Sequence, residues 1–141
     1  MDKALVIGGN GFIGHNLVKR LKEEGYYVVS LDQKHFEYGL NPADEVIIAD
    51  ASSWVIDRNY DRIYQLAADM GGAGFVFTKE NDADILTNSL SINLNILRQL
   101  PKAKIFYSSS ACAYPDGVSG KESDAYPANP PYDYGWEKII S

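Results

Sequence analysis

The sequence predicts an α/β fold with a doubly wound parallel sheet, and three observations predict it. Short apolar runs alternate with longer amphipathic stretches, as in successive strand–helix–strand units. A glycine-rich segment follows the first apolar run directly. The amphipathic stretches carry apolar residues at helical spacing. Because the chain has 141 residues, we expect a single domain over residues 1–141, with a sheet of about five strands.

The expected strands are the short apolar runs that end in turn-forming or polar residues. Parallel strands are buried on both faces, so they are nearly continuous in hydrophobicity. The runs with this character are Ala4–Ile7, Tyr26–Leu31, Glu45–Ala49, Arg62–Leu66 and Lys104–Tyr107.

Three stretches are expected to be helical. The first runs from Gly11 to Glu24, where Gly25 supplies a C-terminal stop. The second runs from Asp82 to Leu100. Its apolar residues are expected on one face and are Ile85, Leu86, Leu90, Leu94 and Leu97. After a loop rich in Pro, Gly, Ser and Asp over Tyr114–Pro131, a last helix is expected to begin near Pro131.

Composition excludes several classes of function. The net charge of −6 disfavours binding to nucleic acid or to an anionic membrane. No apolar run is long enough to span a bilayer. Cys112 is the single cysteine, so an internal disulfide is impossible, and we expect a cytoplasmic protein. The two histidines, His15 and His35, have no zinc-site spacing, so no metal is expected.

The strongest local signal is the segment Gly8-Gly9-Asn10-Gly11-Phe12-Ile13-Gly14, between the first expected strand and the first expected helix. It contains G-x-G-x-x-G from Gly9 and G-x-x-G-x-x-G from Gly8. Such glycines permit a tight turn and a close approach of the backbone to a pyrophosphate, which the helix N-terminus then binds. In this context the segment predicts a Rossmann-type dinucleotide site rather than a plain tight turn.

Acidic residues follow the second and third expected strands. Asp32 lies 18 residues after Gly14. A carboxylate there accepts hydrogen bonds from the adenosine ribose and repels a 2′-phosphate, so NAD is favoured over NADP. Asp50 has two interpretations that the sequence leaves open, a contact with the adenine edge or a cap or loop acid.

Tyr134 and Lys138 are spaced i, i+4 on the last expected helix, so they share a face. A free tyrosine, with a pKa of about 10, is a poor base, and a neighbouring ammonium favours its phenolate. A solvated helix face is the alternative, but the position after the fifth expected strand of a dinucleotide fold favours a base for a sugar hydroxyl. Ser108–Ser110 follow the fifth expected strand, where ligands bind in open parallel sheets. A turn of small residues is the alternative.

Together these residues resemble the extended short-chain dehydrogenase/reductase family of NAD-dependent epimerases and dehydratases, across essentially the whole chain. The resemblance implies that NAD takes a hydride from a sugar carbon of a nucleotide-sugar, with Ser110, Tyr134 and Lys138 assisting. The positions implied to contact NAD are Gly8, Gly11, Phe12, Ile13, Gly14, Asp32, Asp50, Ala51, Leu66, Ala67, Ala68, Asn88, Ser108, Tyr134 and Lys138.

Three stretches resemble more closely the GDP-mannose 3,5-epimerase branch of that family: Leu66–Phe75, Ser109–Pro115 and Lys121–Ala125. The branch implies oxidation at C4, proton exchange at C3 and C5, and re-reduction, with a GDP-hexose substrate and a homodimer. Cys112 matches the exchanging cysteine, although free cysteines are often merely small buried residues. Gly71–Phe75 would form a loop that meets the substrate through Gly71, Gly72 and Ala73, together with Ser110 and Cys112.

Members of the family are much longer than this chain. We therefore expect the sheet to stop after about five strands, the C-terminal sugar-nucleotide domain to be absent, and the chain to be inactive alone. Two alternatives remain open: an NAD-binding module without turnover, and another nucleotide-sugar epimerase, dehydratase or reductase.

Overall fold

The computed structural model describes residues 1–37, 39–118 and 120–141. Contacts divide them into two compact units. Unit 1 comprises Met1–Ala67 and Ile92–Ser108, and unit 2 comprises Ala68–Ser91 and Ser109–Ser141. Unit 1 holds the whole sheet.

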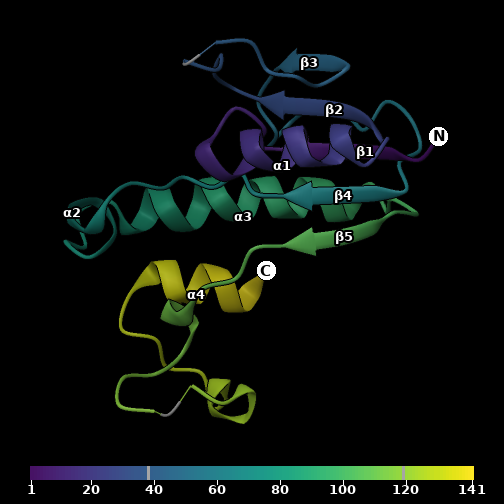
Figure 1. The fold of residues 1–141 in the computed structure, drawn as a ribbon. Helices are drawn as coiled ribbons and strands as arrows, with labels where there is room; N and C mark the ends of the chain where they lie inside the picture. Colours follow the sequence, from purple (N-terminus) through teal and green to yellow (C-terminus); the bar gives the residue numbers. More distant parts are fainter. Residues whose placement is uncertain (38, 119) are drawn as a thin grey trace. The chain divides into compact units, whose positions relative to one another are not determined.

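The sheet of unit 1 has five parallel strands in the order β3-β2-β1-β4-β5 (Figure 1). The predicted α/β parallel fold is therefore confirmed, and each strand lies within one residue of its expected bounds. The strands are β1 (Lys3–Ile7), β2 (Tyr27–Asp32), β3 (Glu45–Ile48), β4 (Arg62–Gln65) and β5 (Lys104–Tyr107). The last residue of β1, Ile7, pairs with Leu31 and Gln65, so the carboxyl ends of three strands share one edge.

Helix α1 (Phe12–Glu23) follows β1 and packs on one face of the sheet. Its buried Val18 and Leu21 contact Ala4, Val6 and Val28. The helix ends in a Schellman motif: Tyr26 N–H donates to Leu21 O at 3.0 Å and Gly25 N–H donates to Lys22 O at 3.1 Å. Gly25 has φ +84°, the left-handed conformation that the motif requires. The predicted glycine stop is thus confirmed.

Helix α3 (Asp82–Arg98) is present, but its predicted apolar face is wrong in part. Leu94 and Leu97 are 43% and 49% exposed. Ser89 and Asn93 are buried instead. Both polar side chains are hydrogen-bonded, since Ser89 Oγ accepts from Asp69 N–H at 3.0 Å and Asn93 Oδ1 accepts from Gln65 Nε2 at 2.8 Å. Satisfied polar groups can occupy core positions that a hydrophobicity pattern does not predict.

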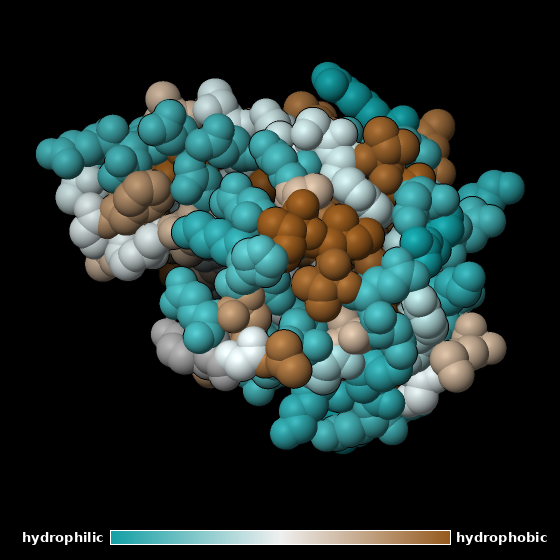
Figure 2. All heavy atoms as spheres, turned by 90° about the horizontal axis from the view of Figure 1, so that it is seen from above, coloured by the Kyte–Doolittle hydropathy of each residue, from teal (hydrophilic) through white to brown (hydrophobic). Residues whose placement is uncertain are grey.

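The other face of the sheet carries a second core, in which Leu5, Ile7, Val29 and Ile63 pack with Ile96 of α3. Apolar side chains also reach a largely hydrophilic surface, as Figure 2 shows. Those exposed on strands are Val46, Ile48, Ile105 and Phe106. Among the described residues, no helix is long and apolar enough to cross a membrane.

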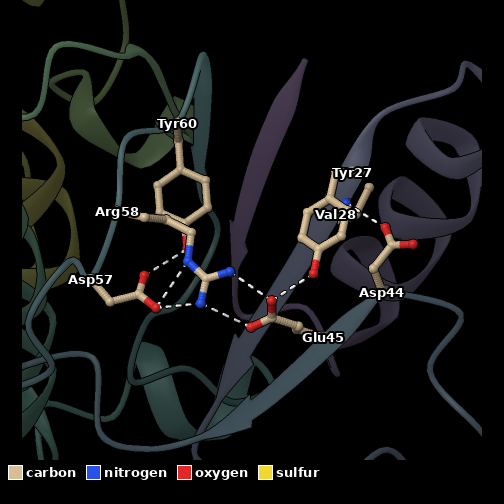
Figure 3. Close-up of polar contacts among 7 residues, drawn as sticks. All are labelled: Tyr27, Val28, Asp44, Glu45, Asp57, Arg58 and Tyr60. Carbon is tan, nitrogen blue, oxygen red and sulfur yellow. Dashed lines mark hydrogen bonds and ion pairs between the residues drawn. The ribbon is translucent and has the colours of Figure 1, made fainter. Parts of the chain in front are cut away.

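Edge strand β3 is held by a polar network (Figure 3). The Arg58 guanidinium donates to both oxygens of Glu45, at 2.6 and 3.0 Å, and Tyr27 Oη donates to Glu45 Oε1 at 2.6 Å. Arg58 Nε also donates to Asp57 Oδ2 at 3.0 Å, and Tyr60 Oη donates to Asp57 Oδ1 at 3.0 Å. Hydrogen bonds from Arg58 lower the pKa of both Glu45 and Asp57, and the hydrogen bond from Tyr27 lowers that of Glu45 further.

Unit 2 contains the part of α3 up to Ser91, several short elements and the last helix, α4 (Asp133–Ile140). The expected loop at Gly71–Phe75 is only partly a loop, because α2 (Ala73–Val76) forms one helical turn there. The expected loop at 114–131 likewise contains a 3₁₀ turn, η2 (Glu122–Ala125), and Ser119 of that loop lies outside the described residues. A second 3₁₀ turn, η1 (Ala111–Ala113), follows Ser110.

Candidate functional site

The segment Gly8–Gly14, here called the glycine-rich turn, connects β1 to α1 in unit 1. Gly8 N–H and Gly9 N–H both donate to Leu31 O, at 2.8 and 3.3 Å, and Gly11 N–H donates to Gly8 O at 3.1 Å. These bonds fold the turn tightly against the carboxyl end of β2.

Two of its glycines are required by the backbone. Gly8 has φ +83°, and a Cβ there would lie 2.9 Å from Ala67 N. A Cβ on Gly14 would lie 2.0 Å from Gly8 O, closer than any real contact. Only hydrogen fits at these positions, which explains the sequence pattern physically.

The start of α1 is a site that fits a pyrophosphate. Gly11 is the N-cap and, within the described part of the chain, no side chain caps the helix. No acidic residue lies in the first turn, and Phe12 and Ile13 are 87% and 66% exposed. The N–H groups of Phe12, Ile13 and Gly14 therefore lack a capping side chain, and with the helix dipole they offer an anion site.

Asp32, the last residue of β2, is fixed by the same turn. Its Oδ2 accepts from Asn10 N–H at 3.0 Å and its Oδ1 accepts from Lys34 N–H at 3.0 Å. A carboxylate has about four acceptor sites, so two remain for ribose hydroxyls. The structure thus holds the predicted ribose acceptor, half-buried, beside the glycine-rich turn.

The other predicted residues of unit 1 lie on the same edge of the sheet or in the core. Asp50 follows β3, and its Oδ1 accepts from Ser52 N–H at 2.8 Å, a bond that lowers the pKa of Asp50. Within the chain Asp50 thus bonds to its own loop, as a loop acid does, and its contact with the adenine edge stays a prediction. Ala51 is buried in the core.

The residues that follow β4 and β5 complete the predicted set in this unit. Leu66 packs against the α1-side core. Ala67 is bonded to the Gln65 side chain through both its N–H and its carbonyl, at 3.2 and 2.7 Å. Ser108 follows β5 and is half-buried.

In unit 2, Tyr134 and Lys138 lie together on α4, as their spacing predicts. Lys138 Nζ is 5.3 Å from the centroid of the Tyr134 ring. Glu137 is fully buried, and its Oε2 lies 3.1 Å from Lys138 Nζ. Sequence reasoning missed Glu137, because a glutamate on a short amphipathic helix gives no sign that it is buried.

Ser110 and Cys112 lie against the same helix. Ser110 caps η1, with its Oγ accepting from Cys112 N–H at 3.2 Å, so its own proton is available to donate. A Cβ on Gly135 would lie 2.1 Å from Cys112 O, so α4 packs directly on the Cys112 backbone. Gly135 was also missed, although a glycine inside a helix is a known sign of close packing.

The remaining predicted residues of unit 2 lie before and within α3. Asn88 Nδ2 donates to Asp69 Oδ2 at 2.8 Å, which ties α3 to the segment that begins at Ala68. Gly72 is the N-cap of α2, so Gly71 and Gly72 lead into the helix that Ala73 begins. The structure thus brings Gly8–Gly14, Asp32 and Ala67 together in unit 1, and Ser110, Cys112, Tyr134 and Lys138 together in unit 2.

The chain matches known proteins over nearly its whole length. The model of the NAD dependent epimerase/dehydratase family matches residues 4–141. The GDP-mannose 3,5-epimerase of Arabidopsis thaliana is 37% identical over 155 residues, covering 99% of this chain and 41% of the relative.

Solved structures of two nucleotide-sugar epimerases have a similar fold. A UDP-galactose 4-epimerase is 27% identical with a TM-score of 0.75, covering 97% of this chain and 48% of that one. The UDP-glucose 4-epimerase of Thermotoga maritima, solved with UDP-glucose, is 26% identical with a TM-score of 0.70, covering 98% and 48%. The chain therefore spans about two fifths of the curated relative and just under half of the solved structures. With its family model matched from residue 4 to residue 141, the chain belongs to the NAD dependent epimerase/dehydratase family, whose cofactor is NAD.

Proposed function

We propose that this chain is the NAD-binding portion of a nucleotide-sugar epimerase of the GDP-mannose 3,5-epimerase type. The observation that carries the proposal is the 37% identity to the Arabidopsis GDP-mannose 3,5-epimerase over nearly all of this chain. The geometry of both units is compatible with it.

Unit 1 supplies the groups that would hold NAD. The uncapped N–H groups of Phe12, Ile13 and Gly14 would bind the pyrophosphate. Asp32 would accept from the adenosine ribose, and its charge would repel the 2′-phosphate of NADP. Asp50 and Ala51 would lie on the adenine side, as the family resemblance implies.

Unit 2 supplies the groups that would move protons. NAD, when bound, accepts a hydride from a sugar carbon. Tyr134 Oη would take the proton of the C4 hydroxyl, with Lys138 Nζ held beside the Tyr134 ring. The Ser110 hydroxyl would hydrogen-bond the same sugar oxygen.

Cys112 would distinguish this chemistry from a simple 4-epimerisation. A ketone at C4 acidifies the protons on C3 and C5. A Cys112 thiolate would remove and return such a proton before C4 is reduced again. Gly71, Gly72 and Ala73 would contact the sugar.

We further propose that the protein acts as a cytoplasmic homodimer, for which sedimentation velocity gives the direct test of association.

Calorimetric titration of the 141-residue chain with NAD and NADP tests the cofactor site. We expect saturable NAD binding and at least about tenfold weaker NADP binding, the scale of one lost charge-assisted contact. Asp32→Asn should reduce that discrimination, because the repelling charge is gone. The proposed cofactor site would be overturned if the wild-type chain bound NAD and NADP with equal affinity, or if it bound neither.

The sugar chemistry is tested in a protein that carries this chain together with a C-terminal sugar-nucleotide domain. Incubated with GDP-mannose in D₂O, it should place deuterium at C3 and C5, and Cys112→Ala should abolish that exchange at one or both positions. The solved relatives include UDP-sugar 4-epimerases, so inversion at C4 is the second candidate. The activity of an enzyme of that kind would not change in Cys112→Ala, and it would place no deuterium at C3 or C5.

A further inference from the structure

The side chain of Asn41, in the connection between β2 and β3, contacts the glycine-rich turn. Asn41 Nδ2 lies 3.1 Å from Gly9 O, 2.7 Å from Asn10 Oδ1 and 2.9 Å from Ser30 Oγ. Gly9 and Asn10 belong to the turn, whereas Ser30 belongs to β2. One amide group therefore ties the turn to the strand that ends in Asp32.

The orientation of this amide follows from its partners. Asn41 Oδ1 accepts from Ala43 N–H at 2.9 Å. A flipped amide would direct its oxygen at the Gly9 carbonyl and would leave Ala43 N–H facing a donor. Asn10 is oriented in the same way, because its Nδ2 donates to Lys34 O at 2.6 Å and so turns its Oδ1 to Asn41. The Asn41 side chain thus acts as a donor toward the turn.

The contact continues to the predicted ribose acceptor. The backbone N–H of Asn10 donates to Asp32 Oδ2 at 3.0 Å. Beneath the turn, Ser30 is fully buried, and a Cβ on Gly9 would lie only 2.2 Å from Ser30 Oγ. The turn therefore rests directly on β2, and Asn41 bonds to both at their junction.

We propose that Asn41 is a positioning residue for the NAD site. It holds Gly9 and Asn10 so that the following N–H groups, of Phe12 to Gly14, stay directed at the pyrophosphate. This inference rests on the proposed NAD binding. It requires a selective effect: losing the Asn41 donor should weaken the binding of ligands that carry a pyrophosphate and leave the binding of a ligand without phosphate unchanged.

The test compares ADP-ribose with adenosine on the 141-residue chain, by calorimetry and by NMR titration respectively. The Asn41→Asp variant keeps the shape and the bond to Ala43 but removes every donor toward the turn. We expect the ratio of the adenosine to the ADP-ribose dissociation constant to fall about tenfold, the scale of one or two net hydrogen bonds.

Gln99→Glu is the matched control. The Gln99 amide accepts from Ile56 N–H at 2.6 Å and donates to Trp54 O at 3.1 Å, so it too bridges backbone groups, at the end of α3. This variant should lose thermal stability yet keep the wild-type ratio of affinities. An equal fall of the ratio in Gln99→Glu would show a general structural effect and would overturn the proposal.

Asn10→Ala keeps the proposal testable if Asn41→Asp does not fold, because it removes only the Asn41–Asn10 contact and the bond to Lys34. A folded variant at either position with an unchanged ratio overturns the role of Asn41 and leaves NAD binding intact. A wild-type chain that binds neither NAD nor ADP-ribose overturns the proposed function itself, so the two failures are distinguishable.

Discussion

At the scale of single residues, the glycine-rich turn depends on contacts between backbone atoms. Gly14 differs from most glycines of the chain because the atoms that a Cβ would meet are Gly8 O at 2.0 Å and Gly9 Cα at 2.8 Å. Gly14→Ala must therefore displace the turn or α1. We expect the free energy of unfolding to fall by more than about 2 kcal/mol, as for strongly overpacked sites, and NAD binding to be lost.

Urea denaturation measures the first effect and calorimetry the second. Gly72→Ala is the control, because Gly72 has φ −70° and nothing lies within 4 Å of its added Cβ. It should change the free energy of unfolding by less than about 0.5 kcal/mol. A Gly14→Ala variant as stable as Gly72→Ala would contradict the steric explanation.

Residues of the candidate site were predictable where one short segment determines their role. The glycine-rich turn, Asp32 and the Tyr134–Lys138 pair follow from local spacing, because a tight turn, a strand end and an i, i+4 face are local features. Asn41 was not predictable, since its partner Gly9 lies 32 residues away. Glu137 and Gly135 were missed for the same reason: their burial depends on neighbours that α4 meets only in the folded unit.

At the scale of elements, the central strands β1 and β2 were predictable because they are buried on both faces and mostly apolar, whereas β3 and β5 were predictable from short apolar runs that stay partly exposed. Helix α3 was predicted in extent but not in orientation. Its spacing allowed Leu94 and Leu97 on the buried face, whereas hydrogen bonds to Asp69 and Gln65 bury Ser89 and Asn93 instead. Hydrophobic periodicity cannot anticipate a polar side chain whose partner belongs to another element.

Edge strand β3 gives a prediction at this scale. It is short, and Glu45 at its first position is held by a two-bond contact with Arg58 and by Tyr27. Arg58→Met should lower the urea midpoint clearly, because Glu45 and Asp57 both lose their cation. Exchange of the β3 amides with solvent should accelerate most, which hydrogen-exchange mass spectrometry would detect.

Arg20→Met is the matched control. Arg20 also contacts two carboxylates, those of Glu23 and Glu24, but its side chain is 68% exposed on α1. Exposed pairs of this kind contribute about 0.3–0.5 kcal/mol. If Arg58→Met proves no more destabilising than Arg20→Met, the network does not hold β3.

At the scale of the whole molecule, the class of fold and the order of elements were predictable, and the division of the candidate site was not. Most residues proposed to bind the cofactor lie in unit 1, whereas Ala68, Asn88 and the residues proposed to transfer protons lie in unit 2. Helix α3 runs from one unit into the other, with Asn88 bonded to Asp69 in unit 2 and Asn93 bonded to Gln65 in unit 1. Only the three-dimensional contacts assign each half of a continuous helix to a different unit.

The dependence of stability on pH is a property of the whole chain. Hydrogen bonds from Arg58 lower the pKa of Glu45 and of Asp57, and the bond from Ser52 N–H lowers that of Asp50. Burial alone would raise the pKa of Asp44, but its bonds to Lys22 and Val28 outweigh burial and lower it. In all four groups the folded state favours the ionised carboxylate.

The sign of the effect follows from proton binding. Below about pH 5.5 the unfolded chain begins to take up protons at these carboxyls while the folded chain does not, so the free energy of unfolding falls on acidification. The net charge of −6 acts in the opposite direction, since acid relieves repulsion. That repulsion is spread over the surface and screened beyond about 8 Å at physiological salt, whereas the Glu45–Arg58 contact is 2.6 Å long. Urea denaturation of the wild-type chain at pH 7, 5.5 and 4 should show a plateau in the free energy of unfolding followed by a decline. The Glu45→Gln variant has no carboxyl group at position 45 to take up a proton. It should therefore be less stable than the wild-type chain at pH 7, and its stability should decline less toward pH 4. A wild-type chain whose stability rises toward pH 4 would show that general repulsion dominates.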